Sequence, residues 1–75
     1  MRLKITDTNF TTKYDWLFKL TDYNDEVYYI MDEFFYRKYN MKTPITRLHL
    51  DSFDKGQSIN ATIREINNRK IVVEL

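Results

Sequence analysis

The sequence predicts a small α+β domain with the element order ββαβββ, in which one amphipathic helix packs on a mainly antiparallel sheet of four to five strands. Three observations predict this fold. Apolar and polar residues alternate near both ends of the chain, apolar residues recur at helical spacing in the middle, and 75 residues are enough for one domain only. We therefore expect residues 1–75 to form a single domain.

Alternation predicts the first two strands. Leu3 and Ile5 share one side of the segment 2–6, while Trp16, Phe18 and Leu20 share one side of the segment 14–21. These sides are expected to face the core, with Trp16 near its centre. The polar stretch 7–13 is expected to form the loop between the two strands.

The segment 24–39, NDEVYYIMDEFFYRKY, predicts the helix. Val27, Ile30, Met31 and Phe34 recur at i, i+3, i+4 and i+7, which places their side chains on one face of a helix. We expect this apolar stripe to cover the sheet.

The ends of this segment agree with a helix. Asn24 or Asp22 can accept a hydrogen bond from the first turn, and the pair Arg37 and Lys38 suits the last turn. The alternative is a strand, favoured by the aromatic and β-branched residues, but a strand would hold Asp32 in its middle. We favour the helix.

Three more strands are expected after the helix, over residues 45–50, 58–65 and 70–75. The last two form a hairpin around the turn Asn67-Asn68, because asparagine tolerates positive φ. The segment 55–75, KGQSINATIREINNRKIVVEL, resembles the closing hairpin of S1-type OB barrels. The helix expected before the third strand does not suit the strand order of such a barrel, so we assign no family from this hairpin.

Composition limits where the protein acts. The net charge is +1 and cysteine is absent, which fits a reducing cytosol. Neither an apolar run of signal-peptide length nor eighteen consecutive apolar residues occur. We therefore expect a cytoplasmic protein without a membrane partner. Asn, Lys, Ile and Tyr, which have AT-rich codons, supply 26 of the 75 residues, so we expect a low-GC bacterium or one of its phages or mobile elements as the source.

Few catalytic chemistries are available to this chain. A single glycine cannot build a Gly-rich phosphate loop, and no Ser-His-Asp or Cys-His set can be proposed. His49, the only histidine, has Asp51 two residues on, but a second histidine or cysteine for a metal site is missing, so a surface histidine is the simpler interpretation. We expect no enzyme, no cofactor and no metal.

The first candidate binding surface is the back of the expected helix. Tyrosine is enriched at interface hot spots, because its large rigid ring loses little entropy on binding. The alternative is that these rings only edge the core or lie flat over their neighbours. The residues of this surface are Tyr28, Tyr29, Asp32, Glu33, Tyr36 and Tyr39.

The second candidate surface is the sheet face away from the helix. Its outward basic residues outnumber the outward acidic ones and can follow a phosphate backbone, although outward aromatic rings for base stacking are lacking. The alternative is a solvated face whose lysines prevent edge pairing. The basic residues are Arg2, Lys4, Lys19, Arg47, His49, Arg64 and Lys70.

From these surfaces we expect a small non-catalytic module that binds a partner protein through the tyrosine-rich helix, including a second copy of itself in a homodimer. An accessory factor of a phage or mobile element, acting as an inhibitor by docking on a host protein, fits this description. The alternative hypothesis is a nucleic-acid-binding domain that uses the basic sheet face.

Overall fold

The computed structural model describes residues 1–11 and 13–75, excluding the side chains of Arg47 and Leu48. The α+β class is confirmed, but the sheet has more strands than predicted and the helices are short. In chain order the elements are β1 (Arg2–Thr8), β2 (Trp16–Thr21), β3 (Val27–Met31), α1 (Glu33–Lys38), α2 (Arg47–Ser52), β4 (Ser58–Asn60), β5 (Thr62–Ile66) and β6 (Arg69–Glu74).

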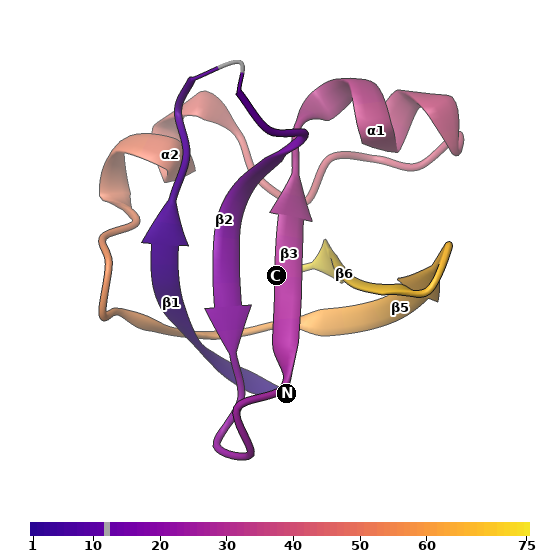
Figure 1. The fold of residues 1–75 in the computed structure, drawn as a ribbon. Coiled ribbons are helices and arrows are strands. Elements are labelled where there is room, and N and C mark those ends of the chain that lie inside the picture. The colour runs from indigo at the N-terminus through magenta and orange to yellow at the C-terminus, as the bar shows by residue number, and fades with distance from the viewer. Residues whose placement is uncertain (12) are drawn as a thin grey trace.

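The six strands form one curled sheet with the order β4-β1-β2-β3-β6-β5. All neighbours are antiparallel except β3 and β6, which are parallel. Only Ala61 separates β4 from β5, so the segment 58–66 pairs with β1 at its start and with β6 at its end. In Figure 1, β1, β2 and β3 lie side by side, β5 and β6 run across them, and both helices lie at one end of the three strands.

The main core fills the inside of the curled sheet. As predicted, Leu3 and Ile5 of β1 point inward, and Phe18 of β2 is fully buried beside them. Leu50 and Phe53, from α2 and the residue after it, pack against this core from one end. The buried residues of the main core are Leu3, Ile5, Phe18, Leu20, Tyr28, Ile30, Ile45, Ala61 and Val72.

A second, smaller core lies on the outer side of the sheet, under α1. Met31 of β3, Tyr36 of α1 and Ile71 of β6 are buried there. Strand β3 is therefore covered on both sides, because Tyr28 and Ile30 face the main core while Met31 faces the second one.

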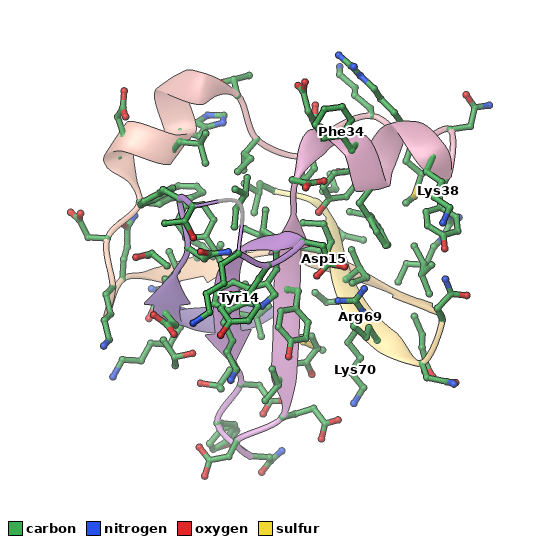
Figure 2. The ribbon with its side chains drawn as sticks, turned by 45° about the horizontal axis from the view of Figure 1, so that its top comes forward. Tyr14, Asp15, Phe34, Lys38, Arg69 and Lys70 are labelled. Atoms are coloured by element: carbon green, nitrogen blue, oxygen red, sulfur yellow. The ribbon has the colours of Figure 1, made fainter. Side chains whose placement is uncertain are left out.

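The prediction of a helix over 24–39 is wrong for most of its length. Val27–Met31 is a strand, and only Glu33–Lys38 is helical. A strand that is buried on both sides lacks the alternation of apolar and polar residues by which strands are recognised. The continuous apolar run of this strand therefore also matched the spacing of a helix face. Phe34, expected in the core, is 70% exposed on α1 (Figure 2).

Two aspartates near this segment explain where its elements begin and end. Asp32 ends β3 and caps α1, because its carboxylate accepts a hydrogen bond from the Phe35 amide at 3.1 Å. Asp22 shapes the β2–β3 loop instead of capping a helix: its Oδ1 accepts from the amides of Asn24 at 2.8 Å and Glu26 at 3.0 Å. The predicted N-cap is therefore wrong, whereas Arg37 and Lys38 lie in the last turn of α1 as expected.

The prediction of a third strand over 45–50 is also wrong, because this segment leads into helix α2. Thr46 is its N-cap, and its amide donates to Nδ1 of His49 at 3.3 Å. The closing hairpin is confirmed, with Asn67 and Asn68 at φ of 51° and 65° in its turn. Neither α1 nor α2 has the length and apolar character needed to cross a membrane, and no other described segment supplies such a helix.

Candidate nucleic-acid interface

A bulge in β2 decides where Trp16 points. Opposite β3, Trp16 pairs with Met31 and Phe18 pairs with Ile30, so two steps on β2 match one step on β3. The extra residue is Leu17, which packs against the main core together with Phe18. Trp16 consequently packs on the outer side with the second core, and the prediction that it shares the inner side of Phe18 is wrong.

Three aromatic rings meet on this outer side. The Tyr14 ring stacks on the Trp16 ring, with centroids 5.4 Å apart and planes 9° apart. The Tyr29 ring of β3 follows at 6.0 Å from Trp16, tilted by 46°. We call these three residues the aromatic ladder. Tyr14 forms its outer end and is 50% exposed.

An ion pair fastens the loop before β2 to β6 beside the ladder. Both terminal nitrogens of the Arg69 guanidinium donate to the Asp15 carboxylate, at 3.2 and 2.7 Å. The guanidinium carbon also lies 5.9 Å from the centroid of the Tyr29 ring. Figure 2 shows Tyr14, Asp15 and Arg69 on the same side of the molecule. The pair therefore links the residue after Tyr14 with the residue that contacts Tyr29.

The Asp15–Arg69 pair shifts the titration of both groups. The hydrogen bonds from Arg69 lower the pKa of Asp15, and the hydrogen bonds to Asp15 raise the pKa of Arg69. A carboxylate whose pKa is lower in the folded state stabilises the fold above its unfolded pKa of about 3.9, and this contribution is lost as the pH falls through the folded pKa.

Replacing Asp15 by asparagine is therefore expected to lower the free energy of unfolding near neutral pH and to have no effect in strong acid. Because the pair is exposed, the loss is at most about 1 kcal/mol. Urea unfolding of both proteins between about pH 2 and 7 measures it, with the difference shrinking progressively as the pH falls below about 4. A difference that stays constant across this range would contradict the assigned pair.

Two lysines lie next to the ladder, and a third lies one strand further along. The Lys13 ammonium lies 5.3 Å from the centroid of the Tyr14 ring, and Lys19 of β2 is directly opposite Tyr29 of β3. Lys4 follows one strand further, opposite Thr21. Among the ion pairs of the described residues, none involves these three lysines. Their charges are thus available to an anionic ligand.

The structure brings together part of the predicted basic face. Arg2, Lys4 and Lys19 alternate with core residues on β1 and β2, and Arg64 lies opposite Ile71 on the outer side of the sheet. The remaining basic residues of that prediction lie elsewhere. Lys70 pairs with Glu26, His49 lies on α2, and Arg47 also belongs to α2 while its side chain is outside the described residues.

The six residues of the predicted tyrosine surface do not share one face. Tyr28 is buried in the main core, where its hydroxyl donates to Asp22 at 2.9 Å, and Tyr36 is buried under α1. Tyr39 ends α1 and packs against the Phe35 ring at 4.8 Å. The other three members are separated as well: Tyr29 is in the ladder, and Asp32 and Glu33 begin α1.

No protein-family model, curated protein or solved structure matches this chain. The candidate site therefore depends on its own geometry. In the part of the chain that the structure describes, groups of three or more histidine, aspartate or glutamate side chains arranged to hold a metal ion are absent.

The sequence contained a signal for the ladder that alternation alone concealed. Lys13, Tyr14 and Trp16 stand close together where β2 begins, and aromatic residues next to cations are typical of surfaces that stack bases. The contribution of Arg69 had no comparable signal, because it comes from the other end of the chain.

Proposed function

We propose that this protein binds single-stranded nucleic acid through the aromatic ladder. The observation that supports the proposal is the stack of Tyr14, Trp16 and Tyr29 on the outer side of β2 and β3, beside lysines that take part in no ion pair among the described residues. Bases of a single strand stack on such rings, whatever their identity, because every base has a π face. The half-exposed ring of Tyr14 is where the first base adds to the stack.

The charges beside the ladder fit the backbone of such a strand. Lys13, Lys19 and Lys4 extend from the β1–β2 loop across two strands, and each can contact one phosphate. Three contacts give a moderate affinity that falls as salt rises, because each contact releases a bound counterion from the strand. A duplex, whose bases are already stacked and paired, cannot use the rings in this way.

The connectivity of the sheet supports the same proposal by analogy. If the segment 58–66 is counted as one strand, three antiparallel strands are followed by a helical segment and a closing hairpin, which resembles the order of an OB barrel. OB barrels bind oligonucleotides on strands 2 and 3 and on the loop between strands 1 and 2. The aromatic ladder occupies the corresponding elements. This is a likeness of architecture alone.

Titration with an oligothymidylate of about 15 nucleotides tests the proposal, since thymidylate forms no internal pairs and spans one site of this kind. Trp16 is the only tryptophan, so quenching of its fluorescence reports stacking within the ladder itself. We expect quenching at about 20 mM salt that weakens steeply as salt is added. A duplex of the same length should quench much less.

Two variants separate stacking from charge. Tyr14→Ala is expected to weaken binding by about 5- to 150-fold, the loss of one stacked base, while Lys19→Gln should lower the salt slope by about 0.7. Tyr23→Ala is the matched control, because Tyr23 is 86% exposed and lies outside the ladder. The proposal fails if wild type shows no complex at low salt, or if Tyr14→Ala binds as tightly as Tyr23→Ala.

A further inference from the structure

We infer that a second surface, at the end of the sheet covered by the helices, binds a cationic amphipathic segment of a partner protein. Two adjoining hollows form this surface, and they share Leu17 and Leu50. We call the two hollows together the helix-end groove. It shares no lining residue with the aromatic ladder and does not depend on the function proposed for the ladder.

Apolar side chains contribute to the lining of both hollows. The first hollow has a volume of about 600 Å³ and is lined by Phe10, Leu17, Leu50 and Phe53. The second continues toward α1 past Met31. The β2 bulge connects the groove with the ladder, because the residue that turns Trp16 outward is the same Leu17 that lines both hollows.

Phe10 packs on the main core although much of its side chain is exposed to solvent. It is 60% exposed, yet its ring contacts Phe18 of the main core edge to face, with centroids 5.6 Å apart. Phe53 contacts the same core ring at 5.7 Å and stacks on His49 at 5.9 Å. Two aromatic rings are thus fixed at the groove by the core before any partner arrives, which reduces the entropy lost on binding.

The charge of the groove selects the partner. Its described lining includes the carboxylates Asp51 and Asp54 in the first hollow and Asp32 and Glu33 in the second, and no lysine or arginine. Glu33 is paired with Arg37 at 3.4 Å, while no ion pair of the described residues involves Asp51 or Asp54. Apolar side chains flanked by lysine or arginine complement this surface, whereas phosphate backbones and anionic membranes are repelled by it.

A model peptide tests the inference. The probe is a labelled helix of about 14 residues built from leucine at i, i+3, i+4 and i+7 and lysine elsewhere, the length at which a helix becomes stable in water. Fluorescence anisotropy should show saturable binding to the full chain. A peptide of the same composition in scrambled order, or one with glutamate in place of lysine, should bind at least about tenfold more weakly.

Matched variants locate the site. Asp51→Asn with Asp54→Asn should weaken binding of the peptide at least about tenfold, and Phe10→Ser should do the same by removing an apolar anchor. The control, Asp25→Asn with Glu74→Gln, removes the same charge outside the groove, and the β2–β3 loop that holds Asp25 lies at the opposite end of the strands (Figure 1). It should leave the affinity within about twofold.

Several results would overturn the inference. Equal binding of the scrambled peptide, or an equal loss in the control variant, would show that general charge attraction explains the complex. Circular dichroism establishes that Phe10→Ser is folded; if it is not, the double asparagine variant decides alone. Tyr14→Ala should bind the peptide like wild type, so failure of the ladder proposal and failure of the groove proposal are separate results.

Discussion

Replacing Tyr36 by alanine is expected to lower the free energy of unfolding by about 3–5 kcal/mol, the usual loss when a large buried aromatic side chain is truncated. A domain of this size has a total of about 4–11 kcal/mol. Tyr36 is fully buried, and its side chain packs from α1 against Met31 of β3 and Ile71 of β6. The variant should therefore be mostly unfolded or close to it, as measured by urea titration followed by circular dichroism.

The hydroxyl of Tyr36 makes a separate contribution to the free energy of unfolding. It accepts a hydrogen bond from the Met31 amide at 3.2 Å and donates one to the Val72 carbonyl at 2.6 Å. The hydroxyl therefore bridges β3 and β6, which also pair directly where Tyr29 lies opposite Ile71. Tyr36→Phe keeps the ring and leaves both backbone groups without this partner, which should cost about 1–3 kcal/mol.

The control for the hydroxyl is Tyr23→Phe at an exposed position, which should change the free energy of unfolding by less than about 0.5 kcal/mol. Burial also raises the pKa of Tyr36 to about 12. Because the unfolded phenol ionises near pH 10, the fold should lose stability as the pH rises from about 10 toward 12. A Tyr36→Phe variant as stable as wild type, with unchanged alkaline unfolding, would contradict the bridging role.

Phe18→Ala is expected to cost about 3–5 kcal/mol, because Phe18 is the ring around which the main core is packed. It is fully buried and contacts Phe10 and Phe53 edge to face. The cavity left by the variant cannot close easily, since strands pair with β2 on both sides of it. Thermal or urea unfolding measures the loss.

Trp16→Ala is the comparison that tests the bulge. If alternation continued through β2, Trp16 would lie in the same core as Phe18 and its removal would be at least as damaging. Because Leu17 is bulged and Trp16 lies half-buried on the outer side, we expect a smaller loss of about 1–3 kcal/mol, measured by circular dichroism. A larger loss than for Phe18→Ala would show that the assigned register is wrong.

The parts of the fold that could be predicted have one solvent-exposed side or a distinctive turn. β1 alternates between buried and exposed residues, and the closing hairpin is recognised by its turn, where Asn67-Asn68 supplies the positive φ. β3 could not be recognised because Tyr28 and Ile30 meet one core while Met31 meets another. Which side of a strand is covered depends on α1, and a local pattern does not contain that information.

Two of the three lysines at the candidate interface could be predicted, but the aromatic ladder could not. Lys4 and Lys19 follow from simple alternation on β1 and β2. The ladder requires a single inserted residue, Leu17, which reverses the direction of every side chain before it, and alternation of period two offers no means to detect such an insertion. The ion pair of Asp15 with Arg69 joins residues that only the finished sheet brings together.

The shared strand 58–66 has a consequence for how fast this domain forms. Arg2 lies opposite Asn60, and β3 pairs in parallel with β6, so closing the sheet requires two pairings between distant parts of the chain. Such long-range pairings form slowly, because the entropy of closing a long loop is lost before the contacts form, so we expect this domain to fold more slowly than a helical bundle of equal length. During synthesis on the ribosome, a growing chain that already exposes Tyr14 and Trp16 lacks the ion pair of Asp15 with Arg69 until the segment that forms β6 emerges.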